Sequence, residues 1–93
     1  MTYVIVRTRS AGCFAGELES KTSTEVVLLN ARRLWYWAGA ASLSQLAVQG
    51  TSNPERCKFP APTPRHTLNE WIEIIETTQQ GRLSIEGVPL WEA

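Results

Sequence analysis

The sequence predicts a small, mostly β (α+β) fold: a partly closed barrel of four or five antiparallel strands, with one short helix and a proline-rich loop. A chain of 93 residues suits a single domain, so residues 1–93 are treated as one unit. Hydrophobic residues make up 43% and charged residues 19%, which is an ordinary globular balance. Short β-rich runs separated by turn residues indicate strands, and closure removes the exposed edges of such a sheet.

The strand pattern is clearest at the N-terminus. Val4 and Val6 face one way there, while Tyr3, Ile5 and Arg7 face the other, and β-branched residues favour a strand. A turn signal follows, and then further alternating, apolar or aromatic runs. We expect strands over residues 3–9, 14–19, 25–29, 34–37 and 68–78, with residues 30–33 breaking the chain between the third and the fourth.

One short helix is expected over residues 43–49. Ser42 with Gln45 three positions later forms a capping-box pattern, and Gly50 stands where a helix stops. Residues 51–67 hold four of the five prolines and are expected to form a long surface loop. The pattern leaves residues 79–93 open: 79–86 fit one or two helical turns, and Pro89-Leu90-Trp91 would then dock an apolar anchor.

The charge is balanced in sum but not in layout. Nine Lys and Arg match nine acidic residues, all of them Glu, and residues 70–93 carry five Glu against one Arg. A long duplex nucleic acid is held by many cationic contacts, so this chain is poorly suited to bind one as a monomer. A ligand with two or three phosphates needs only a few arginines, so the sequence is compatible with binding one.

Neither cysteine spacing nor hydropathy points to a metal, a cofactor or a membrane. Cys13 and Cys57 form no metal-binding motif, and reduced thiols are the default. The N-terminus lacks the pattern of a signal peptide, and the longest apolar stretch, 34–41, is far too short to span a bilayer. We therefore expect a cytoplasmic protein, and no catalytic motif is found.

The unusual feature is a block in which two arginines precede three large aromatics and a helix start. Guanidinium groups suit phosphate, and an aromatic face suits a base. The candidate ligand-binding residues are Arg32 and Arg33 for phosphate, Trp35, Tyr36 and Trp37 for stacking, Ser42 and Gln45 for hydrogen bonds, and Arg7 and Arg9 as an extension of the basic surface. The other interpretation left open is that this block is core or a subunit interface.

Two resemblances extend this interpretation. The segments GCFAGELES at 12–20 and EVVLLNA at 25–31 resemble the first half of the Sm-like barrel signature, over about residues 3–31. That family builds rings, so the resemblance implies a small SH3/Sm-like barrel that assembles. The block NARRLWYWAGAASLSQLA at 30–47 resembles a family of short phage and prophage proteins of uncharacterised function, which implies a viral origin and a host-cell cytoplasmic location.

The sequence thus favours a non-enzymatic phage-type protein that forms a symmetric homo-oligomer. Its expected role is to bind and sequester a small nucleotide-type ligand, such as a cyclic nucleotide immune signal, against host defence. Two alternatives remain at this stage. One is an inhibitor that docks the aromatic block on a host protein, and the other is an Sm-like ring that binds single-stranded RNA.

Overall fold

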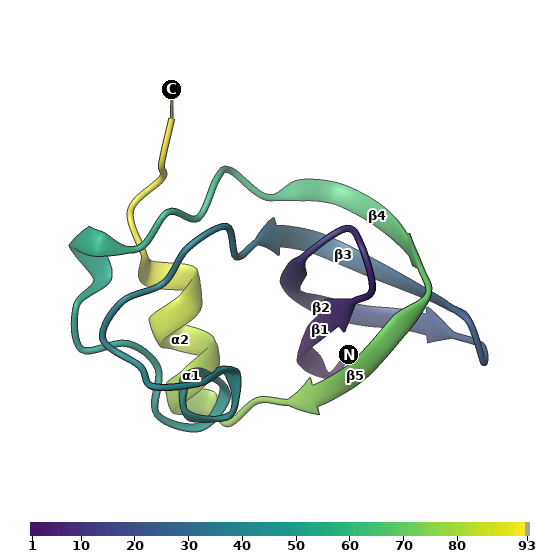
Figure 1. Cartoon of the computed structure of the whole chain (residues 1–93), viewed down its shortest axis with the longest axis horizontal. Coiled ribbons are helices and arrows are strands. Elements are labelled where there is room, and N and C mark those ends of the chain that lie inside the picture. The colour runs from purple at the N-terminus through teal and green to yellow at the C-terminus, as the bar shows by residue number, and fades with distance from the viewer. Residues whose placement is uncertain (93) are drawn as a thin grey trace.

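The computed structural model describes residues 1–92 and contains one five-stranded antiparallel sheet and two α-helices. The elements in chain order are β1 (Tyr3–Thr8), β2 (Cys13–Lys21), β3 (Glu25–Arg33), α1 (Leu43–Gln49), the 3-10 helix η1 (Pro54–Arg56), β4 (Thr63–Asn69), β5 (Trp71–Glu76) and α2 (Gln79–Gly87). The strand order is β4-β3-β2-β1-β5, as Figure 1 shows. The predicted mostly β, α+β fold is confirmed.

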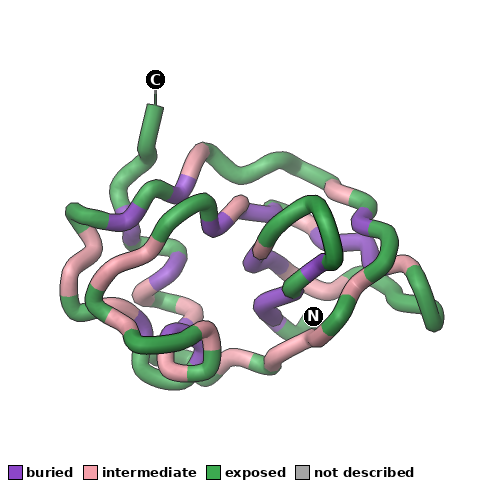
Figure 2. The backbone as a smooth tube through the Cα atoms, viewed as in Figure 1, coloured by how far each residue is buried: buried purple, intermediate pink, exposed green. Residues whose placement is uncertain are grey.

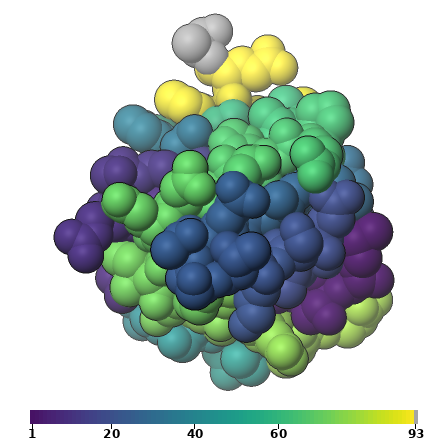
Figure 3. Space-filling view, turned by 90° about the vertical axis from the view of Figure 1, so that its right-hand side faces the viewer, coloured from purple at the N-terminus to yellow at the C-terminus, as the bar shows by residue number. Residues whose placement is uncertain are grey.

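The sheet is curled so that its two edge strands are neighbours in the chain. β4 and β5 lie at opposite edges of the sheet, and only Glu70, with φ of 57°, stands between them. The β2–β3 turn packs against this corner, because the Glu70 N–H donates to the Thr24 carbonyl at 2.7 Å and the Trp71 indole donates to the Thr22 carbonyl at 3.0 Å. Figure 3 shows this end, with the β2–β3 hairpin in front of the β4–β5 segment.

Both faces of β1 are buried, which explains its run of apolar residues. Val4 and Val6 join a core inside the curled sheet, and Tyr3 and Ile5 join a second core against the helices. The alternation predicted for this strand is therefore confirmed. Figure 2 shows buried segments on the inner strands and on both helices.

A bulge carries β3 past the point where the sequence indicated a break. Ala15 pairs with Arg32 and Glu17 with Leu29, so two residues of β3 lie opposite Gly16 alone. Asn30 takes up the extra length with φ of 51°, and a Cβ at Gly16 would lie only 3.0 Å from the Leu29 carbonyl oxygen. The predicted break at 30–33 is wrong, and β3 ends at Arg33.

The predicted strand at 34–37 is also wrong. Tyr36 alone makes an isolated bridge, with Lys58, while the rest of that segment is irregular. The missing strand is β4 (63–69), most of which lies in the predicted proline-rich loop (51–67), and the strand predicted at 68–78 is divided at Glu70 between the end of β4 and β5. β4 tolerates Pro64 because it is an edge strand, where a missing N–H is acceptable.

The two helices pack side by side against one end of the sheet (Figure 1). The predicted α1 is confirmed: the Ser42 hydroxyl accepts from the Gln45 N–H at 3.1 Å, and the Gln45 side chain accepts from the Ala41 N–H at 2.7 Å. α2 settles the conformation that the sequence left open. The apolar anchor expected at Pro89-Leu90-Trp91 is wrong, because these residues are exposed, and the buried residue after α2 is Val88. No helix in the described residues is long and apolar enough to cross a membrane.

Candidate ligand-binding cleft

Two exposed aromatic rings and two exposed cations gather on one surface. Together with their neighbours they line a cleft of about 460 Å³, which we name the aromatic–basic cleft; its residues are Tyr36, Glu55, Arg56, Cys57, Lys58 and Trp91. Its volume lies within the range of known small-molecule sites, about 300–1,000 Å³.

Backbone hydrogen bonds from three irregular segments position these side chains. Tyr36 and Lys58 exchange both backbone bonds, at 3.4 and 2.7 Å, which fixes the two residues opposite each other. η1 holds Arg56 immediately before this bridge. The Trp91 N–H donates to the Phe59 carbonyl at 3.2 Å, and this bond places the indole next to Lys58.

The ammonium group of Lys58 lies close to both rings. Its nitrogen is 5.8 Å from the Tyr36 ring centroid and 5.6 Å from the Trp91 centroid, which is cation–π distance. Tyr36 is 51% and Trp91 38% exposed, so both rings offer area to a ligand. Within residues 1–92, Arg56 and Lys58 make no ion pair, and Glu55 is the one carboxylate in the cleft lining. Formally, the cleft therefore carries one net positive charge.

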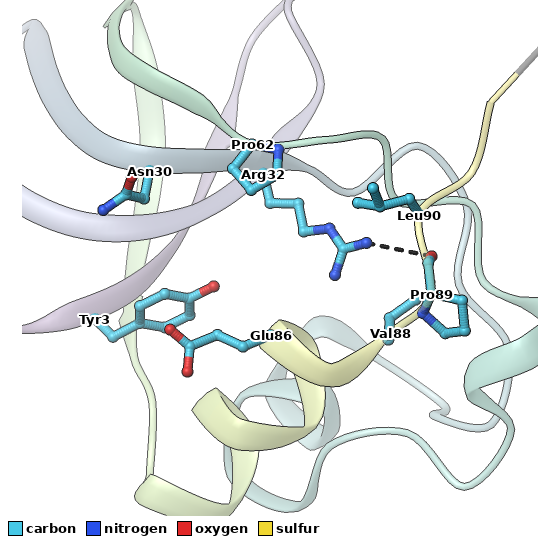
Figure 4. A pocket seen from close by; sticks show the side chains of 8 residues that line it. All are labelled: Tyr3, Asn30, Arg32, Pro62, Glu86, Val88, Pro89 and Leu90. Carbon is cyan, nitrogen blue, oxygen red and sulfur yellow. Dashed lines mark hydrogen bonds between the residues drawn. The ribbon is translucent and has the colours of Figure 1, made fainter.

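Arg32, predicted to bind phosphate, is instead a buried structural residue. It is 3% exposed, and its guanidinium donates to the carbonyls of Phe59, Pro60, Ile85 and Pro89 at 2.8–3.2 Å. These bonds use four of its five N–H donors. Burial lowers the pKa of Arg32, but the group stays charged. Figure 4 shows the side chain reaching across to the C-terminal segment that carries Trp91.

The other predicted arginines lie apart from the cleft. Arg33 stacks its guanidinium over Phe14, 4.4 Å from the ring centroid, and donates to the Ala11 carbonyl at 2.6 Å. Arg7 pairs with Glu73 at 3.1 Å, and Arg9 with Glu70 at 4.0 Å. Each of these three cations thus has a partner in the fold.

Of the predicted aromatic and helix-start residues, only Tyr36 lines the cleft. Trp35 is 64% exposed, whereas Trp37 packs half-buried against the core beside the helices, so the two do not share a face as a strand would require. Ser42 and Gln45 are engaged in capping α1. The sequence analysis missed Arg56, Lys58 and Trp91; the only signal was the cationic pair around Cys57, and the pairing that joins them to Tyr36 is not local.

The chemistry of the remaining groups is limited. Among residues 1–92, no three His, Cys, Asp or Glu side chains gather as metal ligands would. Cys13 and Cys57 are both free thiols, and burial raises the pKa of Cys13, which disfavours its nucleophilic thiolate form.

These features define a class: a small antiparallel β protein with a surface cleft built from aromatic and basic side chains. Residues 1–85 match the family model described as Domain of unknown function (DUF6948), and the chain belongs to this family. The match includes every cleft residue except Trp91. No curated protein and no solved structure matched the chain.

Proposed function

We propose that this protein binds a small nucleotide-type ligand in the aromatic–basic cleft. The observation that carries the proposal is that the Lys58 ammonium lies within cation–π distance of the exposed rings of both Tyr36 and Trp91. A planar base stacks on either ring, and the neighbouring cations attract phosphate. This is the pairing of chemistries expected from the sequence, supplied by a largely different set of residues.

The charge of the cleft favours a ligand with a single negative charge. Arg56 and Lys58 are offset in part by Glu55, which repels a densely charged triphosphate. A phosphodiester carries one negative charge, so a cyclic mononucleotide is the simplest ligand that matches. The cleft volume of about 460 Å³ is sufficient for one base, one sugar and one phosphate.

We propose binding without turnover. The cleft contains no histidine, and its one cysteine, Cys57, is buried with its sulfur 3.5 Å from the Ala38 carbonyl. A protein of this kind acts by lowering the free concentration of its ligand. Sequestration of a nucleotide signal is therefore the role that we propose.

Assembly of copies is part of the proposal. Trp35 neighbours the cleft residue Tyr36 and is 64% exposed, although tryptophan is usually well buried. Tryptophan is also enriched at the centres of protein interfaces. We expect light scattering during gel filtration to report an oligomer that Trp35→Ser weakens; a monomeric wild type at all concentrations would contradict this part.

Binding is tested by titrating the protein with 3′,5′-cyclic AMP, AMP, ATP and adenosine while tryptophan fluorescence is recorded. We expect cyclic AMP to bind more tightly than adenosine, because adenosine lacks the phosphate, and more tightly than ATP. Bound cyclic AMP recovered after denaturation should be intact. If no nucleotide or nucleoside changes the fluorescence, or stabilises the protein to heat, the proposal fails.

A matched pair of variants tests the location. Lys58→Gln removes the cation beside the two rings, whereas Lys21→Gln removes a similar exposed cation that lies 5.6 Å from the Trp71 ring centroid. A charge-assisted hydrogen bond contributes about 1.5–3 kcal/mol, so Lys58→Gln should weaken cyclic AMP about ten- to hundred-fold. Equal effects of the two variants would contradict a site at Lys58.

A further inference from the structure

A second hollow lies beside the C-terminal segment, which also contributes Trp91 to the cleft. We name it the Tyr3 hollow; it measures about 420 Å³ and is lined by Tyr3, Asn30, Arg32, Pro62, Glu86, Val88, Pro89 and Leu90. Strands β1 and β3 supply the first three residues, and α2 with the chain after it supplies Glu86 and the last three (Figure 4). It shares no lining residue with the aromatic–basic cleft.

The main polar feature of the hollow is a hydroxyl that pairs with no protein group. Tyr3 is 6% exposed as a residue, and its hydroxyl is not hydrogen-bonded to any of the described residues; because none of their sealed side-chain polar atoms lacks a partner, the hydroxyl opens on the hollow. Figure 4 shows the phenol pointing into the hollow between Arg32 and Glu86. The Arg82 guanidinium covers the ring, 4.9 Å from its centroid, and holds it there. The hydroxyl can therefore be reached from the hollow and has its hydrogen-bonding capacity free for a ligand.

The hydroxyl is neutral and serves both as donor and as acceptor. Burial, aided by the negative charge of Glu86, raises the pKa of Tyr3 to about 12. At neutral pH the phenol therefore keeps its proton and offers one O–H donor beside its lone pairs.

Neighbouring polar groups have unused capacity of both kinds. Arg32 has one N–H left after its four carbonyl bonds. Glu86 accepts from Arg82 at 3.3 Å through one oxygen, and the other oxygen is open. The Asn30 amide nitrogen donates to Glu17 at 3.2 Å, while its carbonyl oxygen has no partner among residues 1–92. A ligand thus meets donors and acceptors side by side.

The rest of the hollow is apolar. Val88 is buried at its base, and Pro62, Pro89 and Leu90 supply its other apolar walls. The Arg32 and Glu86 charges cancel, so the hollow, unlike the cleft, favours neither an anion nor a cation.

From these contacts we infer that the Tyr3 hollow binds a neutral, flat molecule whose edge carries an N–H donor next to a C=O acceptor, the pattern of a lactam or cyclic imide. The acceptor meets the Tyr3 hydroxyl and the free Arg32 N–H, the donor meets Glu86 or Asn30, and the ring faces meet the proline and leucine walls. This site is independent of the proposed nucleotide cleft.

Uracil is the probe, since it carries this edge, and 1,3-dimethyluracil is the control because methylation removes both N–H donors. Binding is followed by protein NMR shifts. We expect uracil to shift resonances of Tyr3, Glu86 and Val88 with millimolar affinity, and dimethyluracil to bind at least about five-fold more weakly. Equal binding of the two probes, or no shift with uracil, would overturn the inference.

Two hydroxyl deletions locate the contact. Tyr3→Phe should weaken uracil about ten-fold, whereas Tyr36→Phe removes the same group from the cleft and should leave uracil unchanged. If Tyr3→Phe unfolds, Glu86→Gln replaces it, because Glu86 is exposed and its loss should weaken uracil several-fold. Unchanged affinity in the folded variant would refute the site. Lys58→Gln should leave uracil binding intact, which separates this test from that of the cleft.

Discussion

Replacing Arg32 with methionine should destabilise the protein far more than the same replacement at Arg33. Methionine keeps much of the side-chain length but removes the charge and all donors. In Arg32→Met, the carbonyls of Pro60 and Pro89 lose their side-chain donor, while those of Phe59 and Ile85 lose the guanidinium and keep only a backbone donor, the N–H of Trp91 and of Val88 respectively. Arg33 donates to one exposed carbonyl and stacks on a single ring.

The size of the effect follows from the burial of these bonds. Two of the four, to Phe59 and Ile85, are fully buried, and water can replace the two that are partly exposed. At about 1.5–3 kcal/mol for each charge-assisted bond, the buried pair alone contributes about 3–6 kcal/mol. Removing the buried charge also removes its desolvation penalty, which offsets part of this loss. We therefore expect a net loss of stability of about 3–5 kcal/mol for Arg32→Met and about 0.5–1.5 kcal/mol for Arg33→Met.

Urea unfolding monitored by tryptophan fluorescence measures both values. Because 1 kcal/mol shifts the melting temperature of a domain this size by about 4–8 °C, Arg32→Met should melt at least about 12 °C below wild type. The structural role of Arg32 would be refuted if the stability losses of the two variants agreed within about 1 kcal/mol. If Arg32→Met were stable but no longer bound nucleotide, the result would support the predicted role of Arg32 in phosphate binding.

Two further predictions concern the packing of the helices and of β1. The free energy of unfolding should fall between pH 10.0 and about 12, by up to about 2.7 kcal/mol. The cause is that the unfolded chain releases the Tyr3 proton with a pKa of 10.0, whereas in the native state the pKa is about 12. Urea unfolding across this range should lose that slope in Tyr3→Phe, and an unchanged slope would count against the shift. Gly81→Ala should lower the free energy of unfolding by at least about 2 kcal/mol, since its Cβ would overlap the Ala47 carbonyl oxygen. At Gly87 a Cβ meets nothing, so Gly87→Ala should be tolerated, and calorimetry of both variants checks this pair.

Elements whose signals are local could be predicted, and those decided by pairing could not. The β-branched alternation around Val4 and Val6 and the Ser42 cap act within a few residues, so β1 and α1 follow from sequence. Leu34 to Trp37 has strong strand propensity, but only Tyr36 finds a partner, Lys58, in an isolated bridge. Pro64 argues against a strand until its edge position in the sheet is known.

For the same reason, only part of the candidate cleft could be predicted from the sequence. Aromatic and basic residues at 32–37 pointed to the correct chemistry, and Tyr36 does line the cleft. Its partners Lys58 and Trp91 belong to irregular segments that the fold brings together through the Phe59 backbone. No periodicity in the sequence encodes that meeting.

The two adjacent arginines show why composition alone misassigns a role. Because β3 continues through a bulge at Asn30, alternation sends Arg32 toward the helices and Arg33 toward Phe14. The residues around Phe59 and Pro89 lie outside the sheet ladder, and their carbonyls need donors from elsewhere. A guanidinium offers five donors and no acceptor, so it satisfies several such carbonyls at once. An arginine beside irregular, proline-rich segments thus has a structural use as strong as phosphate binding, and the face of the strand on which it lies decides between the two.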